Sequence, residues 1–391
     1  MRRGVWHQFG DRSQKLALDH LQNGVGAGVV ISPRDLSLDS AVRYAEEYHA
    51  LGAHVLIDQQ FYLPDTSVGR LDSYPTVQYR ASISQLHQIS DTELDGLAKA
   101  LEHINRQVQS DGVLAPAVVY EAGRPEIARL NSRLFSGARA VGDLLGLPVY
   151  ATVVLGQSTT ATETTLSQAL ASATSLPADG WYFAFEFDDE RIPSSQGAVQ
   201  RCCGAGLTLA CTGKPLFHAY AGPLGLLSHG FGAAACGLGH SQNLWRFDRG
   251  RWETPDVQGG GGDAPARYFS SALWGTIVHP DETAQIPRQL LAQVMTPSPY
   301  TSPWNRWGAN KHVVHVIGST VQTMSAVDDA RANAHTAIAI LRQAVHLHGV
   351  IGAAGIVLRD GTNSYQANWV DAVEDLLQTR TDDFDYLALL K

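Results

Sequence analysis

The sequence is poor in cysteine and has no long apolar run. It has four cysteines in 391 residues, too few for a disulfide framework, so we expect a reducing, cytoplasmic environment. The first residues include two arginines but no apolar stretch behind them, which argues against a secretory signal. No apolar window is long enough to span a bilayer. We therefore expect a cytoplasmic protein with no membrane partner.

Sequence patterns for metals and cofactors are missing as well. Cys202 and Cys203 are adjacent and Cys211 follows after seven residues, unlike the paired ligands of zinc sites. We expect these three thiols to be buried. The chain has no P-loop, no GxGxxG after a strand and no GxSxG motif. We expect neither a metal nor a cofactor, and ATP-driven, dinucleotide-dependent and serine-hydrolase functions are disfavoured.

Positive charge is scarce too. The chain has 29 Lys and Arg against 38 Asp and Glu, for a net charge of −9, and no long basic run. This balance argues against a broad basic face for nucleic acid, although it leaves a local basic groove open. The hydrophobic fraction of 44% and the charged fraction of 17% are typical of a compact protein with a sizeable core.

What the sequence does have is a repeated pattern of an apolar strand, a polar tip and a helix. Segments with helical spacing separate the strands, and polar residues follow each strand at its carboxyl end. This alternation predicts an α/β fold, a (β/α)8 TIM-type barrel whose active site lies at that end. The first five expected strands are Ala27–Ile31, Ala53–Ile57, Leu114–Val119, Val149–Leu155 and Trp181–Phe185.

The remaining strands are less sharply defined. The sixth is either Leu207–Cys211 or Leu216–Ala219, the seventh is Ala233–Leu238, and Ser271–Val278 is the candidate for the eighth. We expect the barrel to occupy residues 1–285, with a mobile loop near 244–267 because the glycines 259–262 hold no single backbone conformation cheaply. Residues 286–391 are expected to form a helical region packed on the barrel, with helices over Ile286–Val294, Asn310–Thr323, Arg331–His348 and Trp369–Thr379.

Three carboxylates at strand tips are the strongest chemical signal. Asp58, Glu121 and Glu186 each follow an apolar strand, where barrel enzymes place catalytic groups. Carboxylates in a partly dry pocket act as acid, base or nucleophile once their surroundings separate their pKa values. The alternative is structural: they pair with arginines and hold the rim together, the candidates being Arg34, Arg124 and Arg191.

Other rim residues are candidates for substrate binding. The turn Gly239–Ser241 can present backbone N–H groups to an anion, and two histidines end neighbouring strands, where they serve either in proton transfer or only in holding a loop. Asp188 shares a strand face with Glu186. The full set of binding candidates is Arg34, Gln60, Tyr120, Asp188, His218, Tyr220, Gly239, His240 and Ser241.

A Trp- and Arg-rich segment follows the seventh expected strand. Arginine forks bind phosphate and aromatic faces stack on bases, so this segment is a candidate for nucleic-acid contact. The alternative is that it clamps the C-terminal helices onto the barrel. Its arginines are Arg246, Arg249 and Arg251, interleaved with Trp245, Phe247 and Trp252.

The segment Tyr220–Cys236, YAGPLGLLSHGFGAAAC, resembles the late-barrel segment of tRNA-guanine transglycosylases and their DNA-modifying relatives. In that family a glycine–proline turn, a paired-leucine helix, a glycine and a strand before a cysteine occur in this order. The family's nucleophilic aspartate corresponds to Ala235, and its DSGGFQ-type signature and zinc-binding cysteines are absent. The resemblance implies a barrel, but base exchange cannot use the same nucleophile.

Two functions remain open at this stage. The first is an enzyme that acts on a glycosidic or similar bond of a nucleoside-like or phosphorylated substrate by carboxylate acid–base catalysis. The second is a non-catalytic barrel that binds a nucleotide or nucleic acid within a larger assembly. A sugar-phosphate lyase or aldolase is less favoured. It would need a Schiff-base lysine at a strand end, and only Lys214 lies near one. The expected partner is a small-molecule or nucleotide substrate; self-association or a multi-protein complex is left open.

Overall fold

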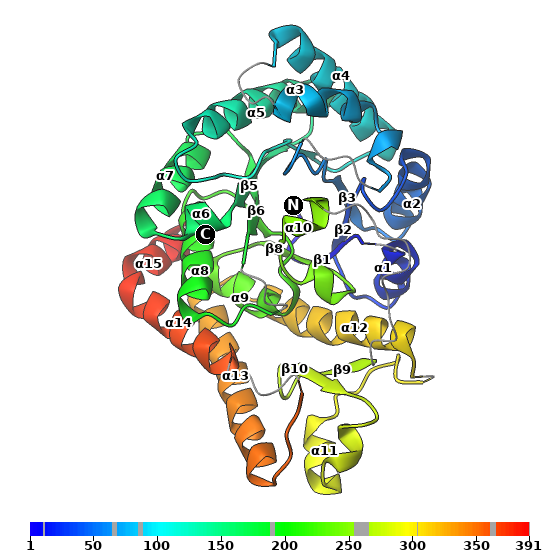
Figure 1. Ribbon diagram of the computed structural model, residues 1–391, viewed down its shortest axis with the longest axis vertical. Coiled ribbons are helices and arrows are strands. Elements are labelled where there is room, and N and C mark those ends of the chain that lie inside the picture. Colours follow the sequence, from blue (N-terminus) through cyan, green and yellow to red (C-terminus); the bar gives the residue numbers. More distant parts are fainter. Residues whose placement is uncertain are drawn as a thin grey trace.

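The computed structural model describes residues 1–10, 12–64, 69–84, 89–187, 192–253, 266–302, 304–359 and 365–390. Within these residues eight parallel strands form a nearly closed barrel with helices around it, as Figure 1 shows. The predicted α/β class, the (β/α)8 barrel and the helical C-terminal extension are therefore confirmed.

The strands follow a simple circular order, β3-β2-β1-β8-β7-β6-β5-β4. The two end strands meet through Asp111, whose N–H donates to the Val55 carbonyl at 2.9 Å and whose carboxylate accepts from the Val55 N–H at 2.7 Å. The strands are β1 (Gly4–Gln8), β2 (Gly28–Ile31), β3 (His54–Ile57), β4 (Val113–Leu114), β5 (Val149–Leu155), β6 (Gly180–Phe185), β7 (Leu216–His218) and β8 (Ala235–Leu238).

Strand alternation separates two hydrophobic layers. In β6, Tyr182 and Ala184 belong to the cluster inside the barrel, whereas Phe183 and Phe185 belong to the layer between the sheet and the helices. This is the period-two pattern of a strand with both faces buried. Glu186 occupies the next inward position, so the strand itself directs this carboxylate toward the barrel mouth.

Helices cover the outside of the barrel. The helix α12 (Arg306–Ser325) completes this ring from the C-terminal part of the chain, because Gly318 lies against Leu238 of β8 and Val5 of β1. The others are α1 (Ser13–Gln22), α2 (Leu38–Ala50), α3 (Arg80–Ser84), α4 (Asp91–Val108), α5 (Pro125–Leu145), α6 (Gln157–Thr160), α7 (Glu163–Thr174), α8 (Gln196–Ala210) and α9 (Gly225–Ser228).

The C-terminal helices pack on one side of the barrel and extend beyond it. The helices α13 (Ala330–Ala353), α14 (Tyr365–Thr379) and α15 (Thr381–Leu389) lie beside α8 and α9, and the far part of α13 meets a small lobe (Figure 1). The lobe contains the hairpin β9 (Arg267–Ser270) and β10 (Gly275–Val278) with α11 (Arg288–Val294). The domain boundary near residue 285 stays an interpretation.

The candidate for the eighth strand, Ser271–Val278, was wrong. Residues 275–278 pair antiparallel with β9 in a separate two-stranded sheet. The barrel is instead completed by β1 at the N-terminus, which pairs with β2 and β8. That strand escapes detection because polar His7 and Gln8 interrupt its short apolar run, although both are buried in the fold.

Two further strand predictions need correction. The expected strand Leu114–Val119 is regular only at its start, because Pro116 has no N–H to donate to the sheet, and β4 ends at Leu114. The alternative sixth strand Leu207–Cys211 falls largely within α8, so Leu216–Ala219 was the correct choice.

In the described part of the chain, no helix combines the length and apolarity needed to cross a membrane.

Candidate functional site

Asp58 lies at the carboxyl end of β3 inside a ring of tyrosines. Its Oδ2 accepts hydrogen bonds from Tyr62 at 2.5 Å, Tyr182 at 3.2 Å and Tyr220 at 3.4 Å. Its Oδ1 accepts from the backbone N–H of Gln60 at 3.0 Å. The carboxyl group is therefore surrounded by donors from three parts of the barrel, and only 4% of the residue is exposed.

The backbone around this carboxyl group is strained. Gln60 and Tyr220 both have a φ of +54°, in the left-handed region that non-glycine residues rarely adopt. The turn at Gln60 aims its N–H at Asp58, and its side-chain oxygen accepts from the N–H of Arg34 at 3.2 Å. Residues held in this conformation concentrate at functional sites, where surrounding contacts stabilise them.

Gln8 of β1 connects two of the tyrosines. Its amide donates to the Tyr182 hydroxyl at 2.8 Å, and its Oε1 accepts from the Tyr220 N–H at 2.6 Å. Gly237 of β8 leaves space for it, since a Cβ at that position would lie 2.3 Å from Gln8 Oε1. Three strands and the loop after β3 thus fix the surroundings of Asp58.

Burial dominates the acid–base character of this group. Desolvation raises the pKa of Asp58 above the ordinary value of 3.8, although hydrogen bonds from the three tyrosines and Gln60 oppose the shift. Burial also raises the pKa of each tyrosine hydroxyl, and the Asp58 charge adds to the effect. The tyrosines therefore remain protonated donors, and Asp58 is the group able to exchange a proton.

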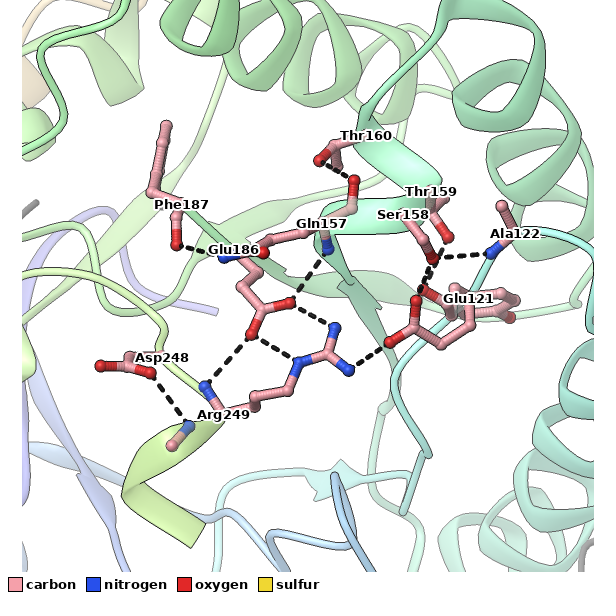
Figure 2. A network of polar contacts seen from close by, with 12 residues as sticks. Glu121, Ala122, Gln157, Ser158, Thr159, Thr160, Glu186, Phe187, Asp248 and Arg249 are labelled. Atoms are coloured by element: carbon pink, nitrogen blue, oxygen red, sulfur yellow. Dashed lines mark hydrogen bonds and ion pairs between the residues drawn. The ribbon is translucent and has the colours of Figure 1, made fainter. Parts of the chain in front are cut away.

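Arg249 bridges the other two rim carboxylates (Figure 2). It pairs with Glu121 through Nη1 and with Glu186 through Nη2, and its Nε donates to Glu186 at 2.7 Å. Glu186 also accepts from the N–H of Gln157 at 3.0 Å, and Glu121 accepts from the Ser158 hydroxyl. The two carboxylates therefore lie on either side of one guanidinium, in agreement with their expected convergence at the mouth.

The segment Trp245–Glu253, which includes α10 (Gly250–Glu253), covers the barrel mouth; Figure 1 shows α10 in front of the ring of strands. Phe247 and Trp252 are fully buried and stack with ring centroids 5.2 Å apart. Both pack edge-on against Tyr62, at 5.1 and 5.0 Å, and against Tyr220. This segment, called the cover below, therefore lies directly on the tyrosine ring around Asp58.

The other arginines of the cover are also paired. Arg246 contacts Asp248 at 3.0 Å, and Arg251 contacts Asp35 in the loop after β2 at 2.6 Å. Arg34 donates to the backbone carbonyl of Arg251. The cover is thus held to the rim by charged contacts on two sides, and phosphate would have to replace these carboxylates to bind the same arginines.

Several predicted binding residues lie away from the mouth. His218 lies in the helix layer with Nδ1 2.8 Å from Ser228 Oγ, and burial lowers its pKa to about 3. Tyr120 belongs to the same outer layer, where its hydroxyl bonds Asn131. His240 Nδ1 lies 2.7 Å from Ser13 Oγ at the start of α1. These side chains hold helices to the sheet.

The predicted anion turn is occupied by its own chain. A Cβ at Gly239 would lie 2.0 Å from the Leu244 Cβ. The Gly239 carbonyl accepts a hydrogen bond from the Trp245 indole at 3.2 Å. The Ser241 carbonyl accepts from the Leu244 N–H at 2.9 Å. The turn therefore anchors the cover. Asp188, Arg191 and the glycines 259–262 lie outside the described residues.

Metal ligands do not gather in this site. Among the described residues there is no group of three or more His, Cys, Asp or Glu side chains arranged to hold a metal ion. All four cysteines are free. Cys202 and Cys203 are buried, as expected, whereas Cys211 is only partly buried; Cys236 is buried as well. The chemistry available at the mouth is that of carboxyl, phenol and guanidinium groups.

The sequence patterns missed Gln8, Tyr62 and Tyr182 as site residues. Tyr182 had a usable signal, because it lies four residues before Glu186 and therefore shares its strand face. Gln8 could not be found without recognising β1. Tyr62 lies in the loop after β3, where strand periodicity ends.

No protein-family model matches this sequence, and comparison with curated proteins finds no matching relative. The resemblance of Tyr220–Cys236 to tRNA-guanine transglycosylases therefore stays a prediction. In the structure this segment runs from the tyrosine ring through α9 into β8, and Ala235 faces the barrel interior.

Proposed function

We propose that this barrel is an enzyme that breaks a glycosidic or similar polar bond of a nucleoside-like or phosphorylated substrate, with Asp58 as the general acid. The observation that carries the proposal is the Asp58 carboxyl group, buried at the carboxyl end of β3 and bonded by three tyrosine hydroxyls. Burial raises the pKa of Asp58, and a raised pKa brings a carboxyl group closer to the range in which a general acid works.

Glu186 is the second carboxylate of this mechanism. Asp58 gives its proton to the leaving group as the bond to the sugar breaks, and Glu186 takes a proton from the attacking water or acceptor. A pair of carboxyl groups with separated pKa values is the usual arrangement for glycosidic bonds. Glu121, on the far side of Arg249, then balances the charge of this guanidinium.

Substrate entry requires the cover to move. Phe247 and Trp252 are fully buried against the tyrosine ring, so they occupy the space a substrate needs in order to reach Asp58. When the cover opens, its aromatic rings can stack on a base of the substrate. Its arginines can then bind phosphate in place of the carboxylates that they contact in the closed conformation. The closed conformation also excludes water from the acid.

The test is a survey of turnover with the full chain. Nucleosides, nucleotides and short RNA and DNA oligonucleotides are incubated with the protein, and released base and exchanged products are measured by liquid chromatography and mass spectrometry. Asp58→Asn and Glu186→Gln should retain the fold and lower turnover by about 10²–10⁴-fold, the usual contribution of an acid or base.

Asp179→Asn is the matched control. This carboxylate accepts from the Val149 N–H at 2.8 Å and pairs with Arg139 at the opposite, amino-terminal end of the barrel. It should keep full turnover. Circular dichroism checks that Asp58→Asn and Glu186→Gln are folded. Wild-type turnover in these folded variants would contradict the mechanism.

A second function has support from one feature of the structure and one of the sequence. Arg249 neutralises Glu121 and Glu186 together, and Ala235 stands where the resembled family has its nucleophile. A non-catalytic barrel that binds a nucleotide or nucleic acid in an assembly would keep such a mouth. Saturable binding in the same survey with no product from any compound would favour this alternative.

A further inference from the structure

A cavity of about 250 Å³ lies on the outside of the barrel between α7, α8 and α14. It is separate from the mouth, since these helices line the outer layer (Figure 1). One face of each helix forms it: positions 163, 166, 167 and 170 of α7 face positions 200, 201, 204, 205 and 208 of α8. This spacing of three and four residues marks a single helix face.

The floor of the cavity is apolar. Leu166, Leu170 and Leu376 are buried and line it. Gly204 leaves the space open, because the nearest atoms to a Cβ there are Arg380 Nη1 and Leu376 Cδ1, both at 3.8 Å. An alanine would fit at this position, whereas a larger side chain would project into the cavity.

The wall contains Arg201, a partly buried residue of α8. The Arg201 Nε is buried and makes no hydrogen bond in the described structure. A buried charged donor without a partner is costly, so a ligand that accepts from it gains affinity. Arg380, across the cavity, is instead fixed by Asp383 and by a 3.1 Å hydrogen bond to Thr208.

We propose that this cavity binds a small organic anion, whose carboxylate or phosphate group accepts from Arg201 while its apolar part lies on the leucine floor. Ligand sites typically combine such an apolar lining with a few polar groups that orient the ligand. The Arg201 fork suits a planar carboxylate or a phosphate equally well. Glu163, at the exposed edge, disfavours a second negative charge at the opening.

The test is isothermal titration of the full chain with three compounds of the same carbon skeleton. These are 4-methylpentanoate, 4-methylpentyl phosphate and the uncharged 4-methylpentanamide. One anion should bind with one site per chain, and the amide should bind at least about tenfold more weakly because it cannot accept a charge-assisted pair. The preferred anion identifies the head group.

Variants locate the site. Arg201→Gln and Gly204→Leu, checked for the wild-type circular dichroism spectrum, should each weaken anion binding at least about tenfold. Arg129→Gln, an exposed arginine on α5, should bind as the wild type does. Lack of binding by both anions at 10 mM (about a hundredfold above a typical metabolite Kd of 0.1 mM), or unchanged binding in either folded cavity variant, would overturn the proposal.

Discussion

At the residue scale, Arg249 connects more of the barrel mouth than any sequence pattern indicated. Its guanidinium lies between Glu121 and Glu186 (Figure 2), and its backbone is part of the cover. Gly156 is part of this arrangement, because a Cβ there would lie 2.6 Å from Arg249 Nη2. The expectation that rim carboxylates pair with arginines was right in kind, but Arg34 and Arg124 do not provide the pairing for these carboxylates.

Replacement of Arg249 by methionine should therefore destabilise the fold strongly. Glu186, whose side chain is 2% exposed, would lose the partner of its charge, and such a loss typically costs about 3–5 kcal/mol. The double variant Arg249→Met, Glu186→Gln should recover part of this loss, because the fully buried group at position 186 is then neutral and the Glu121 side chain, which is 21% exposed, keeps access to water. Urea unfolding of the wild type, both single variants and the double variant measures the coupling.

This account would be contradicted if Arg249→Met lowered the free energy of unfolding equally in the wild type and in the Glu186→Gln variant. The exposed pair of Arg342 with Glu374, whose side chains are 64% and 31% exposed, provides the comparison. Its coupling should lie within about 1 kcal/mol, since solvent screens surface pairs.

At the scale of elements, the cover is the feature that sequence periodicity could not place. Its nine residues contain neither a long helix nor a strand, yet Trp245, Phe247 and Trp252 are buried. Their aromatic character was visible, but the sequence left two interpretations open: contact with bases, or a clamp between the C-terminal helices and the barrel. In the structure Phe247 and Trp252 pack on Tyr62 and Tyr220 at the barrel mouth, whereas Trp245 packs on Phe269 of the small lobe.

Trp252→Ala should loosen the cover specifically. The side chain is fully buried, and truncation of a buried tryptophan costs about 3–5 kcal/mol. We expect hydrogen exchange to increase first in residues 245–253 and around Tyr62, before the outer helices. Trp307→Ala, which removes a side chain in a residue that is 39% exposed, is the control and should leave exchange at the mouth unchanged. Uniformly faster exchange throughout the barrel would show that the cover does not open separately.

The regular elements were far easier to predict. The helices α2, α4, α5 and α7 have apolar positions at helical spacing, in agreement with the helical segments expected between the strands. The strands β2, β3, β5 and β6 are near-continuous apolar runs, as both faces are buried in a barrel. The strand β1 was missed because burial of its polar residues depends on partners elsewhere, such as Tyr182 for Gln8.

At the scale of the whole molecule, several buried histidines make stability depend on pH. Burial lowers the pKa of His7 to about 4, of His218 to about 3 and of His229 to about 4, from the ordinary value of 6.5. His20 is fully buried, neither of its ring nitrogens has a hydrogen-bond partner among the described residues, and burial lowers its pKa well below 6.5. These rings remain neutral in the folded protein.

Stability should therefore fall as the pH drops below 6.5. The unfolded chain binds more protons than the folded chain between about pH 4 and 6.5, and each such histidine costs about 2 kcal/mol at pH 5. Asp58 acts in the opposite direction, since its raised pKa reduces stability as the pH rises above 3.8. Because the histidines outnumber it, the net loss should occur on acidification.

Urea unfolding at intervals from pH 4 to 8 measures this dependence. The free energy of unfolding should rise between pH 5 and 6.5 and level off above pH 7. His335→Gln, at an exposed position, should reproduce the wild-type curve. A free energy that stays constant between pH 5 and 7 would mean that these histidines titrate in the fold as they do in the unfolded chain.

The sequence by itself determined the barrel, since an apolar strand, a polar tip and a helix repeated along the chain leave few other ways to bury both faces of a sheet. It also indicated which carboxylates reach the rim, because Asp58 and Glu186 follow β3 and β6 directly and Glu121 follows the irregular segment after β4. Only the tertiary structure decided what those carboxylates meet: tyrosines from distant strands around Asp58, and a single arginine between the other two. Those contacts join residues separated by up to 162 positions, and local periodicity carries no record of them.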